Sequence, residues 1–354
     1  MKNRTARLTL FCLLFGNVII AQPKKPVTSL IGPDSYSVPV NQKGALVGKI
    51  LPATDKINSK ISLVKDTSNL FRIDKKGNIS LKKRAQLLPS SPDFRYAITF
   101  KAGGVQKEIE LVKDQFIHNK VIAHRGAWKN HNASQNSLSS VKNAISIGCE
   151  ASEFDIWMSS DGVPVICHDP SVGGRIIEQT SFEELSKIAL KNNDFVPTLE
   201  QYLLVIKGQN KTCLVPEIKA SLISQERTLE LTEKVVNMVH KLKVQAWVSC
   251  YISFNHGALI KIMELDPFAK TAYLGNDKTV KDLKEDNMWG IDFNGKMFVD
   301  DKNLTRDAHA LGLTVNAWTI DRIEDMKSLL NEGADFITTN EPEMLLDFVK
   351  SNNK

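Results

Sequence analysis

Short apolar runs alternate with amphipathic helical patterns through residues 119–350, and this alternation constrains the fold more than any other feature of the chain. The strand-like runs lie at 121–124, 212–219, 246–253, 313–318 and 335–338. The helical patterns that follow them lie at 137–147, 224–242, 257–265 and 321–331. Repeated strand–helix units favour a parallel sheet, and the length of this region suits a (β/α)₈, or TIM, barrel. A doubly wound open sheet is the alternative, but no glycine-rich nucleotide-binding loop supports it.

Residues 26–117 have a different, all-β pattern. Short alternating runs, separated by turn residues, lie at 44–50, 61–64, 70–74, 79–81, 96–100 and 107–112. Several short strands at this spacing predict a small β-sandwich domain. The stretches 47–55 and 71–79 resemble a cadherin-type repeat, but Asn41 stands where calcium-binding repeats of that type usually have an acid. We therefore expect a spacer or docking module rather than a calcium-dependent adhesion domain.

The first 21 residues have the pattern of a secretory signal peptide. Lys2, Arg4 and Arg7 precede an apolar run at 8–20, and Ala21 supplies a small residue at the expected cleavage point. The sequence therefore predicts export to the periplasm, the cell surface or the medium, with a retained N-terminal anchor as the alternative. The net charge of +6 is mild for 354 residues, and no dense basic run predicts binding to nucleic acid.

Residues 153–169 carry two strand-like runs that flank an Asp-Gly pair at 161–162, a dipeptide typical of two-residue hairpin turns. Side chains alternate along a strand, so Glu153 and Asp155 share one face. With a two-residue turn, His168 stands opposite Asp155 and points to the same side. Paired acids are costly to bury, and a divalent cation such as Ca²⁺ or Mg²⁺ offsets that cost. The alternative is an exposed hairpin whose polar face contacts water.

Two further polar groups end predicted strands, where a barrel places its chemistry. His124 and Arg125 supply an acid or base and a planar fork for phosphate oxygens. Glu217 and Lys219 share a face, and they suit a metal ligand beside a phosphate contact. Each group also has a structural explanation. The first can be a loop histidine with a surface arginine, and the second an ion pair inside a barrel.

Taken in order, these motifs resemble the glycerophosphodiester phosphodiesterase family over residues 119–350. The matching segments are His124-Arg-Gly126, Glu153-Phe-Asp155, 161–169, 196–200, Glu217-Ile-Lys219, 317–320 and 333–340. The resemblance implies a TIM barrel of the phospholipase C-like phosphodiesterase type. It also implies metal-dependent hydrolysis of glycerophosphodiesters to an alcohol and sn-glycerol 3-phosphate.

Carried over residue by residue, the resemblance also implies roles for individual side chains. The two catalytic acid/base residues correspond to His124 and His168. The metal ligands correspond to Glu153, Asp155 and Glu217. The phosphate and substrate contacts correspond to Arg125, Lys219 and Trp318, the last also being explicable as a core tryptophan. We expect Gln135 to belong to the same substrate-binding set. The chain departs from the family at Gln135, where a glutamate is common, and at Asn340, where an aspartate often begins the turn.

Other functions remain open from the sequence. A phosphatidylinositol-type phospholipase or lyase would release a cyclic phosphate, and an inactive relic would serve only as a surface binding protein. A glycosidase also uses paired carboxylates, although the adjacent His124 and Arg125 favour phosphate. The expected partner is a small glycerophosphodiester, with peripheral contact to a membrane or cell envelope through the β-domain.

Overall fold

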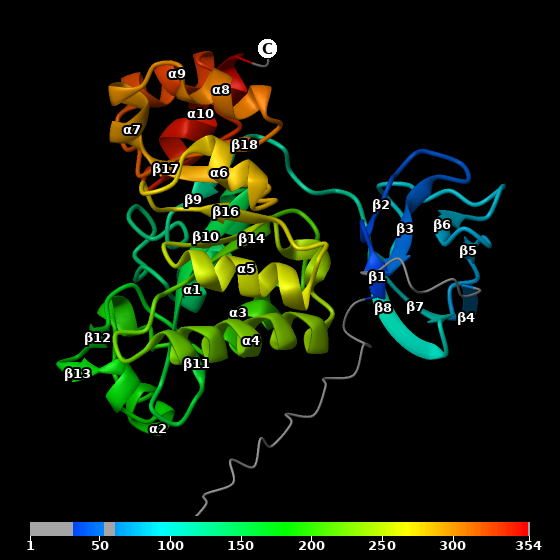
Figure 1. Ribbon diagram of the computed structural model, residues 1–354, viewed down its shortest axis with the longest axis horizontal. Helices are drawn as coiled ribbons and strands as arrows, with labels where there is room; N and C mark the ends of the chain where they lie inside the picture. The colour runs from blue at the N-terminus through cyan, green and yellow to red at the C-terminus, as the bar shows by residue number, and fades with distance from the viewer. Residues whose placement is uncertain (1–30, 53–60, 353–354) are drawn as a thin grey trace, which may run out of the picture.

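The computed structural model describes residues 31–52 and 61–352 and comprises a large barrel domain and a smaller β-domain (Figure 1). The predicted signal peptide, residues 1–21, lies outside the described residues. Within the described parts of the chain, no helix is both long and apolar enough to cross a membrane.

The large domain is a closed ring of parallel strands, which confirms the predicted TIM barrel. The ring strands are β9 (Val121–Ala123), β10 (Ala151–Met158), β14 (Cys213–Ile218), β15 (Tyr251–Ser253), β16 (Thr271–Tyr273), β17 (Gly290–Asn294), β18 (Thr314–Trp318) and β19 (Phe336–Thr339). The ring closes because β9 pairs in parallel with both β19 and β10. The open doubly wound sheet is therefore excluded.

Helices surround the ring and join successive strands (Figure 1). They are α1 (Leu138–Ile147), α3 (Leu199–Ile206), α4 (Gln225–Leu242), α5 (His256–Leu265), α6 (Val280–Glu285), α7 (Gly295–Asp300), α8 (Leu304–Ala310), α9 (Ile323–Asn331) and α10 (Pro342–Asn352). Helix α4 shows why these segments are helical: Leu231, Val235 and Val239 recur every four residues and are buried in the barrel core. Its N-cap is Ser224, whose side chain accepts a hydrogen bond from the backbone N–H of Arg227.

A small insertion follows β10 and precedes α3 (Figure 1). It contains β11 (Pro164–Ile166), β12 (Ser171–Val172), β13 (Arg175–Ile176) and α2 (Phe182–Leu185). Strand β11 pairs antiparallel with β10, so the predicted hairpin exists. The insertion has its own apolar centre around Trp157, Val165 and Leu185.

The β-domain confirms the predicted sandwich. One sheet contains β1 (Ile31–Pro33), β3 (Leu46–Pro52), β6 (Asn78–Leu81) and β5 (Phe71–Ile73), and the other contains β2 (Ser37–Val38), β8 (Val105–Lys113), β7 (Arg95–Ala102) and β4 (Ser62–Asp66). Phe71 and Ile79 from the first sheet share a buried core with Ile98 and Phe100 from the second. The likeness to a cadherin repeat stays a prediction.

The β-domain contacts the barrel at the N-terminal ends of the barrel strands. Asn210, just before β14, donates a side-chain hydrogen bond of 2.8 Å to the carbonyl of Lys113. The backbone N–H of Ile117 donates to the carbonyl of Lys211 at 2.8 Å, and Lys243, at the end of α4, pairs with Glu108. These contacts place the β-domain at the end of the barrel opposite the carboxyl ends of the strands.

Candidate active site

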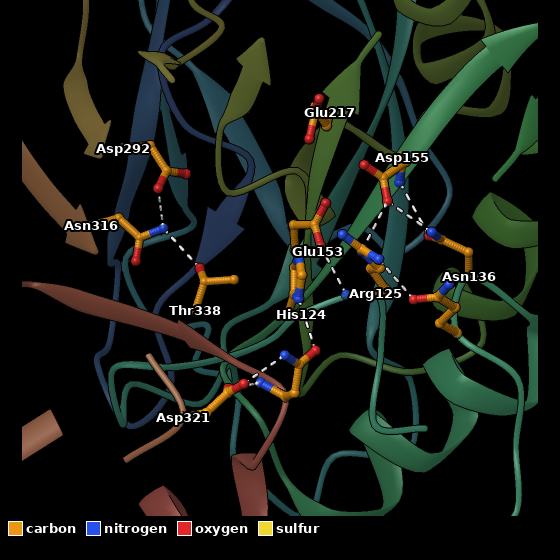
Figure 2. A network of polar contacts seen from close by, with 12 residues as sticks. His124, Arg125, Asn136, Glu153, Asp155, Glu217, Asp292, Asn316, Asp321 and Thr338 are labelled. Atoms are coloured by element: carbon orange, nitrogen blue, oxygen red, sulfur yellow. Dashed lines mark hydrogen bonds and ion pairs between the residues drawn. The ribbon is translucent and has the colours of Figure 1, made fainter. Parts of the chain in front are cut away.

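Three buried carboxylates form the centre of the site, two of them inside β10 and the third near the carboxyl end of β14 (Figure 2). Glu153 and Asp155 are two residues apart on β10 and face the barrel interior, as their spacing predicts. The parallel register pairs Asp155 with Glu217 of β14. One oxygen from each carboxylate lies within 4.8 Å of the others, so the three side chains could hold a metal ion.

The charges of the three acids are only partly balanced by the protein. Lys219 Nζ lies 3.0 Å from Asp155 Oδ1 and 2.8 Å from Glu217 Oε1. Burial and the neighbouring Asp155 raise the pKa of Glu217 to about 8, and burial together with the other two acids raises the pKa of Glu153 well above its usual range. Burial also acts to raise the pKa of Asp155, but Lys219 and nearby cationic groups outweigh it and lower that pKa. An all-oxygen donor set with excess negative charge suits a hard divalent cation.

His124 follows β9 directly and is held by a relay of polar groups from the C-terminal part of the sequence, which follow the neighbouring strands β18 and β19. Its Nδ1 lies 2.8 Å from Asn340 Oδ1, and Asn340 donates through Nδ2 to Asp321 Oδ2 at 2.8 Å. Because the amide of Asn340 is oriented by Asp321, its oxygen accepts the Nδ1 proton of His124. The unprotonated Nε2 then points into the site, 4.0 Å from Glu153 Oε2. Burial and the adjacent Arg125 lower the pKa of His124 to about 4, so the ring is neutral at pH 7.

Arg125 turns back over the acids because its backbone is left-handed, with φ of 57°. Its backbone N–H donates to Glu153 Oε2 at 2.8 Å, and its side-chain Nε lies 3.6 Å from Asp155 Oδ2. Gln135, which departs from the family pattern, accepts a hydrogen bond from Arg125 Nη1 at 2.8 Å. A neutral amide therefore aligns the guanidinium without neutralising its charge. The neighbouring Asn136 donates to Asp155 Oδ2 at 2.7 Å and holds that carboxylate in place.

The prediction that His168 stands directly opposite Asp155 is wrong. In the hairpin, Ile156 pairs with Ile166 and Met158 with Pro164, so the register is shifted by one residue. The turn is longer than two residues because the N–H of Ser159 bonds to the carbonyl of Val163 at 3.0 Å. His168 lies beyond the end of β11 and still lines the cavity. Its Nδ1 lies 2.7 Å from Asp169 Oδ1, which leaves Nε2 available to the site.

The acids and histidines line a cavity of about 190 Å³. Trp318 forms part of its wall rather than the core, and Phe254 packs edge-on against it with ring centroids 5.6 Å apart. A second, larger pocket of about 480 Å³ shares His168 with the first and is also lined by Trp128, Gln135 and Lys191. The structure thus brings all of the predicted site residues to one end of the barrel.

Sequence reasoning missed several polar side chains of the site, namely Asn136, Asp292, Asn316, Asp321 and Asn340 as the partner of His124. Asp292 had a usable signal, an acid inside the apolar run of β17. Asn136 carried another, because an asparagine just before a predicted helix favours a left-handed backbone, and the structure gives it a φ of 58°. The contact of Asn340 with His124 joins residues 216 positions apart, and that of Asp321 with Asn340 joins two different strand-to-helix loops, so nothing local predicts either.

Comparisons with known proteins agree with this geometry. Residues 124–344 match the model of the glycerophosphoryl diester phosphodiesterase family. A glycerophosphodiester phosphodiesterase of Caldanaerobacter subterraneus subsp. tengcongensis is 26% identical over 243 residues, covering 65% of this chain and 97% of its own length.

Solved structures of phosphodiesterases also match this chain. A glycerophosphodiester phosphodiesterase from Parabacteroides distasonis superposes with a TM-score of 0.64 at 34% identity, covering 68% of this chain and 100% of that one. An Oleispira antarctica phosphodiesterase, solved in complex with the product sn-glycerol-3-phosphate, superposes with a TM-score of 0.57 at 25% identity. The match covers 65% of this chain and 96% of that one. Since the family match spans more than half of the sequence, this chain belongs to the glycerophosphoryl diester phosphodiesterase family of enzymes.

Proposed function

We propose that this enzyme hydrolyses glycerophosphodiesters to an alcohol and sn-glycerol 3-phosphate, in a reaction that depends on a divalent metal ion. The observation that carries the proposal is one cavity lined by two histidines, two cationic side chains and the buried carboxylates Glu153 and Glu217. The solved Oleispira relative, with sn-glycerol-3-phosphate as its product, supports the same substrate class.

The charged side chains of the cavity suit a phosphodiester. Arg125 and Lys219 offer N–H donors to the two non-bridging phosphate oxygens, and they balance charge that grows as the phosphorus is attacked. Glu153, Asp155 and Glu217 would hold the divalent ion, which supplies a Lewis acid for a phosphate oxygen. Their oxygen donors fit Ca²⁺ or Mg²⁺ equally well in chemical type.

The two histidines have environments that suit different roles. His124 is neutral and fixed with Nε2 unprotonated, so it can accept a proton from the group that attacks the phosphorus. That group is a water molecule, or a substrate hydroxyl that first closes a cyclic phosphate which water then opens. His168 has its Nδ1 2.7 Å from Asp169 Oδ1, so its Nε2 is free to face the substrate, and we assign to it the role of proton donor to the departing alcohol. A new P–O bond forms to the attacking oxygen, the P–O bond to the alcohol breaks, and the alkoxide takes the proton from His168.

The first experiment supplies glycerophosphocholine, glycerophosphoethanolamine and glycerophosphoglycerol to the purified protein, with calcium, with magnesium and with chelator. Release of sn-glycerol 3-phosphate only in the presence of metal supports the proposal. A cyclic phosphate as final product would identify the lyase instead. Metal binding without turnover of any diester would identify a binding protein.

Variants at the two histidines test the mechanism. Each of His124→Ala and His168→Ala is expected to lower kcat by about 10²–10⁴-fold, the usual contribution of a general acid or base. His309→Ala is the matched control, because His309 is a surface histidine of α8 that pairs with Asp335. Near-normal turnover in either site variant would remove that histidine from the mechanism.

We also propose that the protein is exported and that the β-domain contacts the cell envelope. The basic and apolar pattern of residues 1–21 supports export. Cell fractionation with N-terminal sequencing of the mature protein tests this. A cytoplasmic protein that retains residues 1–21 would contradict export, and equal envelope binding by protein lacking the β-domain would contradict the docking role.

A further inference from the structure

A second polar cluster lies in the barrel interior, on the side of His124 and Glu153 away from Arg125, Asp155 and Asn136 (Figure 2). It consists of Asp292, Asn316 and Thr338. Asn316 Nδ2 donates to Asp292 Oδ1 at 2.7 Å and to Thr338 Oγ1 at 2.8 Å. Asp292 and Thr338 line the same cavity as the histidines, so the cluster faces the site and not the core.

The barrel fixes the position of this cluster firmly. Asp292 of β17 is the direct register partner of Asn316 of β18. Trp318 Nε1 donates to the carbonyl of Asp292 at 2.8 Å, which ties the carboxylate-bearing strand to the cavity wall. Asp292 is only 2% exposed, so its side chain has almost no contact with bulk solvent.

The protein leaves part of this cluster without partners. Across the described residues, Asp292 Oδ2 accepts no hydrogen bond, and no lysine, arginine or histidine forms an ion pair with Asp292. Asn316 Oδ1 is also buried without a hydrogen-bond partner. Burial raises the pKa of Asp292 to about 7, against the smaller opposing effect of Asn316. Buried acceptors of this kind are costly unless a donor reaches them.

The two pockets indicate which part of a substrate provides that donor. In the proposed mechanism the alcohol that leaves lies near His168. This residue borders the larger pocket of about 480 Å³, which has room for groups of different size. The other substituent of the phosphate then enters the smaller cavity of about 190 Å³, where Asp292 lies beside the apolar side chains of Leu274 and Trp318. Glycerol fits this lining because it offers hydroxyl donors on a short carbon chain.

We infer that Asp292, held in place by Asn316 and Thr338, accepts hydrogen bonds from the glycerol hydroxyls and makes the site selective for diesters that carry a hydroxyl group close to the phosphate. This inference deepens the proposed function and rests on it. Asp292 is a specificity-determining residue that contacts the part of the substrate retained in the product phosphate.

The test compares two diesters that differ only in these hydroxyls, glycerophosphocholine and propylphosphocholine. Choline release is measured for both, so one readout serves both substrates. We expect the wild type to prefer glycerophosphocholine in kcat/KM by about 10²-fold or more, since a site built to bind a hydroxyl rejects the analogue without it. Asp292→Asn keeps the acceptor for Asn316, and Asp292→Ala removes the side chain.

Both variants are expected to lose about 10- to 100-fold in kcat/KM for glycerophosphocholine, because hydrogen bonds between its hydroxyls and a charged group are lost. Their kcat/KM for propylphosphocholine should equal that of the wild type. Asp347→Asn is the matched control, because Asp347 is an exposed aspartate on α10. Equal losses with both substrates would show a structural role and overturn the inference. A wild type that cleaves both diesters equally would also overturn it, whereas a wild type that cleaves neither would overturn the proposed function itself.

Discussion

Gly126→Ala is expected to disturb both the stability and the catalysis of this enzyme. Gly126 follows Arg125 in the turn above the acids and has a φ of +78°, in the left-handed region. An added Cβ would lie 2.5 Å from Ser140 Oγ, 2.6 Å from Ser140 Cβ and 2.7 Å from the Ser140 carbonyl carbon. Ser140 forms the capping box of α1 with Ser137, so it cannot move without displacing the start of that helix.

The size of the effect follows from two contributions. The left-handed backbone costs an alanine about 1–2 kcal/mol. Overpacking against a fixed backbone atom adds about 1–3 kcal/mol. The free energy of unfolding of the barrel should therefore fall by about 2–5 kcal/mol. Because the N–H of Arg125 donates to Glu153 at 2.8 Å, a displaced turn should also lower kcat.

Urea unfolding followed by tryptophan fluorescence measures this loss in the barrel, since all five tryptophans lie between residues 128 and 318. Gly174→Ala is the matched control: Gly174 has a φ of +76° in the β12–β13 hairpin, and an added Cβ there meets no atom within 4 Å. The control should lose only the backbone contribution. Equal losses in the two variants would refute the contact with Ser140 as the cause.

Three more outcomes are expected. Asn340→Ala removes the acceptor for the Nδ1 proton of His124. It should lower kcat by about 10–100-fold with little change in KM, and it should alter the pH–rate profile. An unchanged profile would contradict the relay from Asp321 through Asn340 to His124. Calcium or magnesium at about 100 times its Kd should stabilise the protein by about 2.7 kcal/mol, which is measured as a rise in Tm. Glu217→Gln should reduce this rise. An equal rise in the variant would exclude Glu217 as a metal ligand. Asp292 binds its proton more tightly when folded, with a pKa of about 7, so its contribution to stability is present below about pH 4 and is lost as the pH rises to about 7. Asp292→Asn should therefore gain stability relative to the wild type over that window in urea unfolding, and a constant difference would contradict the raised pKa.

The parts of the fold that the sequence predicted correctly are those with strong local patterns. The long apolar stripe of α4 and the serine before α1 located those helices to within a residue. Strand β16 was missed because its three residues are too few to show a period. The predicted strand at 246–253 is shorter than expected, since Gln245–Trp247 forms a 3₁₀ turn that buries Trp247.

In the candidate site, too, the features set by local sequence were predictable and those set by tertiary structure were not. The alternation that places Glu153 and Asp155 on one face is local, and it was predictable. The hairpin register was not, because the side chain of Ser159 accepts from the N–H of Val163 at 2.9 Å and lengthens a turn that Asp-Gly alone predicts to be tight. His168 lines the cavity from beyond the end of β11, where strand pairing no longer determines the direction of a side chain.

The β-domain and the candidate active site occupy opposite ends of the barrel, so a role of the β-domain in attachment would not interfere with access of substrate to the site. The carbonyl of Lys113 accepts from Asn210 at the N-terminal end of the strands, whereas His124 follows the carboxyl end of β9. A surface or partner held by the β-domain leaves the mouth of the barrel open to small diesters arriving from the other side. If the β-domain binds the cell envelope as proposed, replacing it with another module would change what the barrel is attached to and leave turnover of small diesters unchanged.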